Sequence, residues 1–295
     1  MKYYLGMDIG GTKCAVVLSE KNSVSVKDKI RFETRVERGY SEIIAELISS
    51  ALEIMQRNGV SADDVLACGV SCGGPLDSEK GIIMRPPNLP DWDHVPLAEW
   101  QFGAGKGTEN MIFLTFGTGM GAGLILNGKL YSGACGTAGE VGHIRLDADG
   151  PVAYGKAGSF EGFCSGAGIA AMGKKMLAIY NGETSIPYND VTAKTIAEAA
   201  EKGDRLAGAI YRRCGEKLGL GLSILIDILN PERIVIGSIF QRSGHLLIES
   251  MEESIKKEAL EISAQCCKIV PAMLGDEIGD FAAIGVAKDF AEGKK

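Results

Sequence analysis

The chain has 295 residues, of which 45% are hydrophobic and 23% charged, and its formal net charge at pH 7 is −7. This composition is typical of a soluble globular protein, and the length suits two domains that each bury a core. Lysine and arginine form no run, which argues against a nucleic-acid-binding face. The eight cysteines contain no CxxC pair, and they indicate reduced thiols. We therefore expect a cytoplasmic protein without a signal peptide or a membrane span.

The first third of the chain reads as strands, one helix and a loop. Short apolar runs predict strands at residues 3–9, about 13–19, about 30–36 and 65–77, and the spacing of apolar residues predicts a helix at 41–58. A proline-rich stretch at residues 81–100 indicates an irregular segment. Strands followed by helices, with glycines at strand ends, favour an α/β fold.

From residue 111 the pattern restarts with a strand, a Gly-Thr-Gly turn and a second strand. Two helices follow within residues 192–229, then a buried strand at 233–240 and a closing helix at 279–290. Because the second part begins as the first does, we interpret the chain as a duplication at the level of domains.

Two strand ends carry the same kind of glycine turn. "YYLGMDIGGTK" places Asp8 before Gly10–Thr12, and "MIFLTFGTGMGAG" places Gly117–Gly119 after a strand. Backbone N–H groups of such turns can approach phosphates closely, and a carboxylate is compatible with phosphates when Mg²⁺ or its water lies between them. Each turn alone could be a hairpin with incidental glycines. Two copies, one preceded by an aspartate, favour a site for nucleotide phosphates.

Six segments, taken in order, resemble the ROK family of repressors, open reading frames and kinases. They are "DIGGTK", "GVSCGGPLD", "NLPDW", "FGTGMGAGLILNG", "AGEVGH" and "FEGFCSG". The resemblance implies a two-lobed actin-like ATPase fold, a duplicated ribonuclease H-like α/β architecture with a cleft between the lobes. We expect one lobe at residues 1–102, a second at 103–278, and a closing helix at 279–295 that packs back on the first lobe.

The resemblance also implies roles for individual residues. Phosphate and nucleotide contacts are expected from Asp8, Gly10, Gly11, Thr12, Lys13, Gly117, Thr118, Gly119 and Gly237, with Asp8 holding Mg²⁺ through water. The sugar is expected to contact Gly74, Asn88, Glu140, His143 and Glu161. Two carboxylates and an imidazole suit the hydroxyl groups of a sugar ring. A histidine alone is more often structural, but His143 follows Glu140 by three residues in the family's E-x-G-H pattern.

One departure from the family pattern concerns zinc. Most members hold zinc with the E-x-G-H histidine and three cysteines of a C-x-C-G-x-x-G-C run. Here the corresponding stretch, residues 152–162, contains no cysteine, Tyr154 and Ser159 stand where two of those thiols are expected, and Cys164 lies too far along to replace them. Because a structural zinc site needs four nitrogen or sulfur ligands and only His143 is left, we predict no zinc.

A second departure concerns catalysis. Family kinases carry a strand ending in E-N-D, followed by a helix, and that aspartate is the general base. Here "VPLAEW" runs directly into "QFGAGKG", so that about two dozen residues are missing relative to the family. Asp91 and Asp93 are nearby carboxylates without a family counterpart. Either the chain has lost this edge strand and its helix, or the sequence lacks a real segment.

These observations leave three functions. The first is ATP-dependent phosphorylation of a hexose or N-acetylhexosamine, which needs ATP and Mg²⁺. The second is a non-catalytic sugar-binding pseudokinase or sensor. The third, a DNA-binding repressor, would need an N-terminal winged helix-turn-helix, which the start of this chain does not offer. The expected partners are a sugar and possible homodimerisation, with neither nucleic acid nor membrane.

Overall fold

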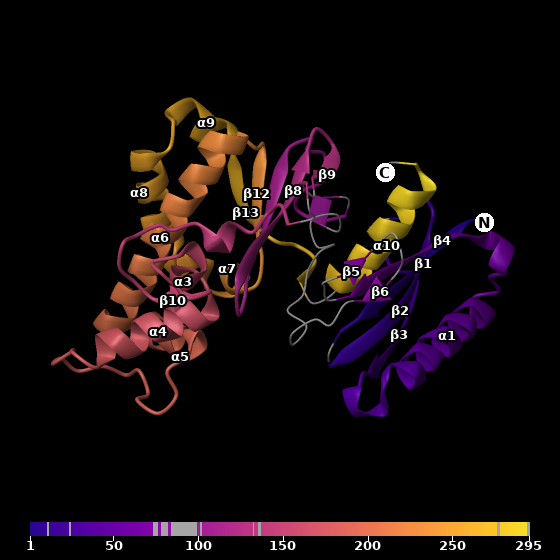
Figure 1. Ribbon diagram of the computed structural model, residues 1–295, viewed down its shortest axis with the longest axis horizontal. Coiled ribbons are helices and arrows are strands. Elements are labelled where there is room, and N and C mark those ends of the chain that lie inside the picture. The colour runs from indigo at the N-terminus through magenta and orange to yellow at the C-terminus, as the bar shows by residue number, and fades with distance from the viewer. Residues whose placement is uncertain are drawn as a thin grey trace. The chain divides into compact units, whose positions relative to one another are not determined.

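The computed structural model divides the chain into two compact units, which are described separately (Figure 1). Unit 1 comprises Met1–Gly107 and Met273–Lys295, and unit 2 comprises Thr108–Ala272. The structure describes residues 1–10, 12–23, 25–72, 76–77, 82–83, 99–100, 102–131, 133–134, 137–275 and 278–293. Within these residues, no helix is both long and apolar enough to cross a membrane.

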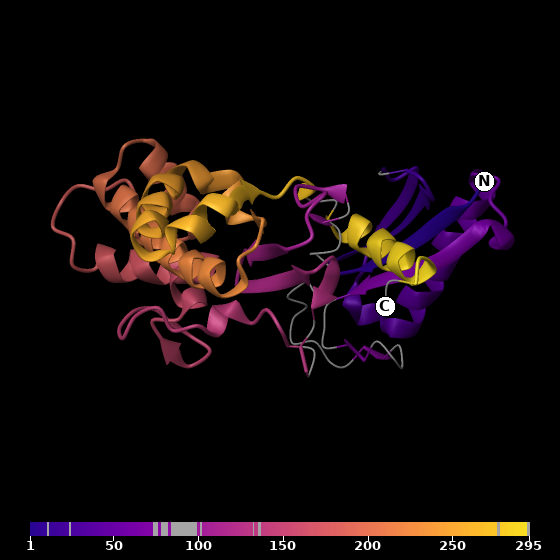
Figure 2. The ribbon, with the colours of Figure 1, turned by 90° about the horizontal axis from the view of Figure 1, so that it is seen from above.

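Unit 1 is a mixed four-stranded sheet with a helix on each face (Figures 1 and 2). The strand order is β3-β2-β1-β4, with β1 antiparallel to β2 and parallel to β4. The strands are β1 (Tyr3–Ile9), β2 (Lys13–Glu20), β3 (Asp28–Glu33) and β4 (Val65–Cys72), and the helices are α1 (Tyr40–Arg57) and α10 (Ile278–Ala291). Short 3-10 helices span Val36–Arg38 and Ala62–Asp64, and β5 (Leu76–Asp77) pairs with β6 (Ile82–Ile83).

The two-residue alternation of strand side chains explains the two layers of unit 1. Leu5 and Val16 belong to the cluster that packs against Leu47 of α1. Their neighbours Tyr4 and Val17 point the other way, into a cluster with α10. The sheet is therefore buried from both sides where these helices cover it.

Unit 2 is built on a five-stranded sheet in the order β13-β12-β7-β8-β9. Its strands are β7 (Met111–Phe116), β8 (Met120–Leu126), β9 (Lys129–Tyr131), β12 (Arg233–Ile236) and β13 (Lys268–Pro271), and a small hairpin joins β10 (Val152–Ala153) to β11 (Lys156–Ala157). Its helices are α3 (Phe160–Phe163), α4 (Gly166–Leu177), α5 (Ala193–Glu201), α6 (Arg205–Leu229), α7 (Ile239–Ser243), α8 (Ile248–Glu258) and α9 (Glu261–Cys266), with 3-10 turns at Val141–His143 and Gly244–Leu246.

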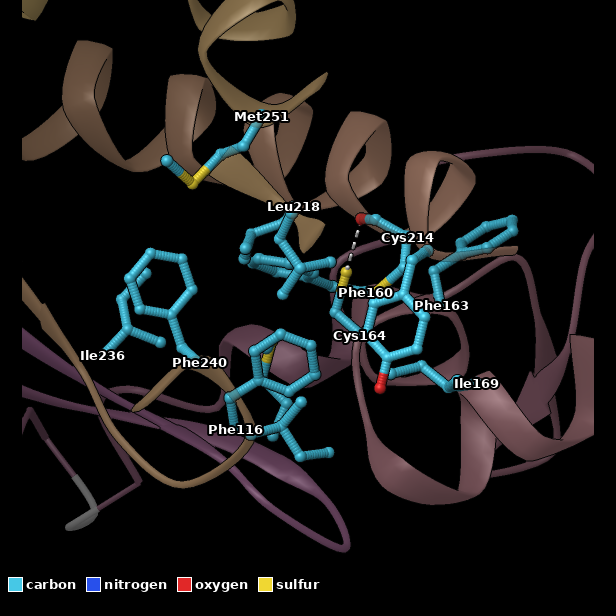
Figure 3. Close-up of a cluster of buried hydrophobic side chains, with 14 of the residues drawn as sticks. Phe116, Phe160, Phe163, Cys164, Ile169, Cys214, Leu218, Ile236, Phe240 and Met251 are labelled. Carbon is cyan, nitrogen blue, oxygen red and sulfur yellow. Dashed lines mark hydrogen bonds between the residues drawn. The ribbon is translucent and has the colours of Figure 1, made fainter. Parts of the chain in front are cut away.

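The core of unit 2 brings the sheet, α3 and the long helix α6 together (Figure 3). Phe116 of β7, Phe160 of α3 and Leu218 of α6 are fully buried in one cluster. The Cys164 thiol donates to the carbonyl oxygen of Cys214, with 3.6 Å between the two atoms. Burial raises the pKa of Cys164 well above its ordinary value, so this thiol is protonated.

The predicted mixed α/β fold is confirmed, and most predicted elements form. Three predicted strands end earlier than expected. The strand predicted at 65–77 ends at Cys72 as β4, and Leu76–Asp77 belongs to the separate strand β5. The strand predicted to reach residue 36 ends at Glu33, where a 3-10 helix begins at Val36. The strand predicted to reach residue 240 ends at Ile236, because Ser238 has a positive φ of 54° and α7 starts at Ile239.

Candidate functional site

The second glycine turn of the sequence lies between β7 and β8 in unit 2. The Gly117 N–H donates to the Gly119 carbonyl oxygen (3.1 Å), and the Gly117 carbonyl accepts from the N–H of Gly166, the first residue of α4 (2.7 Å). A Cβ atom at Gly117 would lie 3.6 Å from Oγ of Ser238, which follows Gly237 at the end of β12. The structure thus brings the predicted Gly117–Gly119 turn beside the predicted Gly237, with Thr118 exposed.

Glu161 lies in the first turn of α3, directly beside this glycine turn. Its Oε2 accepts from the Met120 N–H at 2.9 Å and from the Tyr154 hydroxyl at 3.1 Å. A Cβ atom at Gly119 would come within 2.8 Å of the same oxygen. Oε1 accepts no hydrogen bond from the described residues. This carboxylate oxygen can therefore accept a hydrogen bond from a hydroxyl group of a ligand.

The segment "AGEVGH" contacts β8 beside Glu161. The Ala122 N–H donates to the Gly139 carbonyl oxygen at 2.7 Å. A Cβ atom at Gly142 would lie 2.4 Å from the Met120 carbonyl oxygen and 3.2 Å from Cβ of Glu161. Only glycine therefore permits this close approach. Glu140 precedes the 3-10 helix Val141–His143, and the side chains of Glu140 and His143 are exposed.

Tyr154 is a site residue that sequence reasoning treated only as a missing cysteine. Its ring stacks on that of His143, with centroids 4.0 Å apart and an angle of 23° between the planes. Burial of part of the side chain and the charge of Glu161 raise the pKa of Tyr154 to about 12. The phenol is therefore protonated at neutral pH and donates to Glu161. The sequence carries only a weak signal for it, the glycine that follows Tyr154, because the favoured first residues of such a turn are asparagine, aspartate and glycine.

The first glycine turn joins β1 to β2 in unit 1. The Gly10 N–H donates to the Lys13 carbonyl oxygen (3.0 Å), and Thr34 holds the turn by donating from its hydroxyl to Gly10 and from its N–H to Thr12. Asp8 is half-buried near the end of β1 and pairs in register with Ser71 of β4. Thr12 and Lys13 are exposed. Gly11, Gly74 and Asn88 lie outside the described residues, as do Asp91 and Asp93.

The donor set around His143 does not fit a tetrahedral zinc ion. Over the described part of the chain, no group of three or more His, Cys, Asp or Glu side chains could hold a metal. Tyr154 is stacked on His143, and the Ser159 hydroxyl is engaged as the cap of α3, where it accepts from the Gly162 N–H at 3.1 Å. Neither side chain is a typical zinc ligand.

The sequence of the chain matches a known family, and its fold matches solved structures from that family. The model of the ROK family matches residues 4–100 and 96–289. The chain belongs to the ROK family. Its fold is the actin-like ATPase fold of ROK sugar kinases, as in the crystal structure of a ROK family glucokinase from Streptomyces griseus in complex with glucose and AMPPNP. That structure has a TM-score of 0.71 and 26% identity, and the match covers 97% of this chain and 99% of the other.

Curated relatives in this family carry two kinds of name. A glucokinase from Thermotoga maritima is 28% identical over 316 residues, covering 97% of each chain. A xylose repressor from Caldicellulosiruptor bescii is 27% identical and covers 92% of this chain and 74% of the repressor. The glucokinase alignment exceeds the 295 residues of this chain by 21 positions. The family match divides at residues 96–100, next to the place where the family's E-N-D segment is expected and this sequence does not contain it.

Proposed function

We propose that this protein binds a hexose or an N-acetylhexosamine together with Mg²⁺-ATP and transfers phosphate slowly between them. The observation that carries this proposal is the Glu161 carboxylate, which is bonded to the N–H that follows the Gly117–Gly119 turn. A sugar hydroxyl on Glu161 and a phosphate on the turn would be neighbours. Phosphoryl transfer depends mainly on such positioning and on neutralisation of charge.

Within the sugar site, Glu161, His143 and Glu140 would accept and donate hydrogen bonds to ring hydroxyls. The ring nitrogens of His143 make no hydrogen bond to the described residues, and its stacking partner covers a face of the ring and not an edge. These groups therefore remain able to bind a polar ligand.

Asp8 is the residue that would hold Mg²⁺ in unit 1. A single half-buried carboxylate at the end of β1 fits this ion, which usually takes one or two carboxylates with substrate phosphates and waters. When bound, the ion neutralises charge on the phosphates. Asp8→Ala should weaken ATP binding more with Mg²⁺ present than without it. Equal losses with and without Mg²⁺, measured by calorimetry, would contradict this role.

A second function, a sugar-binding pseudokinase or sensor, is favoured by one specific observation. The part of unit 1 that the structure describes has four strands in its sheet, and the family match divides where the base-bearing strand is expected. Relatives at 28% and 27% identity are named glucokinase and xylose repressor, so identity does not decide between catalysis and sensing.

The deciding experiment measures binding and turnover separately. Calorimetry with glucose and N-acetylglucosamine tests the sugar site, and coupled ADP release with the same sugars tests catalysis. Binding with slow turnover supports the proposed kinase. Binding without turnover favours the sensor, and absence of binding contradicts both.

A further inference from the structure

Two hairpins of unit 2 have the same turn geometry but different residues. In β8–β9 the turn is Asn127-Gly128, and in β10–β11 it is Tyr154-Gly155. Both turns have φ angles of 52° and 68° at their two residues. A two-residue turn with both φ angles positive favours Asn-Gly, because few other side chains tolerate the left-handed conformation. Tyr154 therefore opposes the local preference that Asn127 follows.

The contacts of Tyr154 can offset this conformational cost, and all of them lead to the candidate site. Its ring stacks on His143 and its hydroxyl donates to Glu161. The following strand adds a tether, since Lys156 Nζ donates to the His143 carbonyl oxygen at 2.7 Å. Yet 57% of Tyr154 is exposed, which is more than a side chain placed only for core packing would show. Backbone strain of this kind is typical of functional positions.

We propose that Tyr154 is a positioning residue that fixes the His143 ring and the Glu161 carboxylate for the sugar, in a site without a structural metal. The stack orients the imidazole, and the phenol occupies Oε2 of Glu161 so that Oε1 faces the ligand. This inference rests on the proposed sugar site, and it gives the ring of Tyr154 the orienting task that bound zinc would otherwise perform.

The test uses a substitution that should preserve or raise the melting temperature and still lower the affinity for sugar. Tyr154→Asn installs the favoured turn residue, so the melting temperature should stay equal or rise by about 1–3 °C. The affinity for glucose or N-acetylglucosamine, whichever binds tighter to the unmodified chain, should nevertheless fall by about 10-fold or more. Tyr154→Phe keeps the stack and loses only the hydroxyl group, so it should lose about 2–10-fold.

Asn127→Tyr is the matched control, because it places the same residue in the same turn away from the site. It should lower the melting temperature and leave sugar affinity unchanged. If Tyr154→Asn keeps full affinity, or if it lowers the melting temperature more than Asn127→Tyr does, Tyr154 is a structural residue and the proposal is wrong.

A measurement without sugar separates this proposal from the proposed function. The chain has three histidines, so the ring protons of His143 can be assigned in NMR spectra by substitution. Stacking on Tyr154 should shift these protons upfield, Tyr154→Phe should preserve the shift, and Tyr154→Asn should remove it. If the shift is the same in all three chains, the stack does not form and the proposal fails. If the shift follows this order but neither sugar binds, the sugar site is wrong while the positioning of His143 stands.

Discussion

The sheets of the two units begin alike and end differently. In each, three antiparallel strands are followed by a parallel partner, as β3-β2-β1-β4 in unit 1 and β9-β8-β7-β12 in unit 2. Unit 2 then adds β13 beyond β12, whereas the described residues of unit 1 place no strand beyond β4. The four strands of the described sheet of unit 1 therefore correspond in order and direction to four of the five strands of unit 2.

The side chains of the corresponding strands β12 and β4 differ in burial. On β12, Ile234, Val235 and Ile236 are all fully buried, so both faces and the edge are covered. On β4, Leu66 is 38% exposed and Val70 41% exposed, while Gly69 between them packs tightly on α10. One face of β4 is therefore covered and the other is partly open. The family resemblance implies a further strand and a helix, and such a helix would be a natural cover for that open face.

The largest expected effect concerns turnover, because this sequence does not contain the E-N-D segment to which the family resemblance assigns the general base. General-base assistance is worth about 10²–10⁴-fold in rate, so the kcat of this chain should fall below that of the Thermotoga maritima glucokinase by such a factor. Inserting the corresponding segment of that glucokinase between residues 93 and 99 should recover turnover. The same insert with its E-N-D aspartate changed to asparagine is the control.

Robust turnover by the unmodified chain would contradict this prediction. It would show that another carboxylate serves as the base, and that the end of the described sheet of unit 1 at β4 has no catalytic consequence.

The next largest effect concerns sugar affinity and Glu161 of unit 2. Glu161→Gln exchanges a charge-assisted hydrogen bond to the sugar for a neutral one, at a cost of about 1–3 kcal/mol, or about 5–150-fold in affinity. Calorimetry with the sugar that the unmodified chain binds measures this loss. Glu258→Gln, on the surface of α8, is the matched control and should bind sugar normally. An unchanged affinity in Glu161→Gln would remove this carboxylate from the sugar site.

The architecture could be predicted from the sequence because the patterns that indicate it are local. Short apolar runs marked β1 and β2, and the Gly-Thr-Gly turn marked the junction of β7 and β8. The family motifs also pointed to Glu161 and His143, which the structure brings to one place around Met120 and Tyr154.

The remaining features depend on tertiary contacts that no local pattern contains. Tyr154 reaches His143 because a hairpin folds back over the E-V-G-H segment, and its turn lacks the asparagine that usually marks such a hairpin. Ser238 ends β12 early through a positive φ that serine rarely adopts. Close approach of Gly142 to Met120 likewise becomes visible only when β8 and the segment are placed together.

A smaller effect is expected on the packed face of β4. A Cβ atom at Gly69 would lie 2.0 Å from the Ala283 carbonyl oxygen of α10, so Gly69→Ala must displace the helix. We expect the free energy of unfolding to fall by about 1–3 kcal/mol, as for other overpacked sites. Denaturant titration measures it. A fall of less than about 0.5 kcal/mol, the range of surface substitutions, would mean that α10 does not pack closely on β4.

The smallest effect on stability is expected on the open face of the same strand. Leu66→Thr with Val70→Thr keeps strand-forming residues and removes apolar area that is already partly in water. The free energy of unfolding should therefore change by no more than about 0.5 kcal/mol. What should change is the surface, because contiguous exposed apolar side chains bind hydrophobic dyes and promote self-association. The double variant should bind less of the dye ANS and scatter less light at high protein concentration. Ile179→Thr, an isoleucine of unit 2 that is 76% exposed, is the control and should alter neither signal. If the double variant instead loses stability as Gly69→Ala does, Leu66 and Val70 are covered in solution. The side chains of β4 are then buried as fully as those of β12.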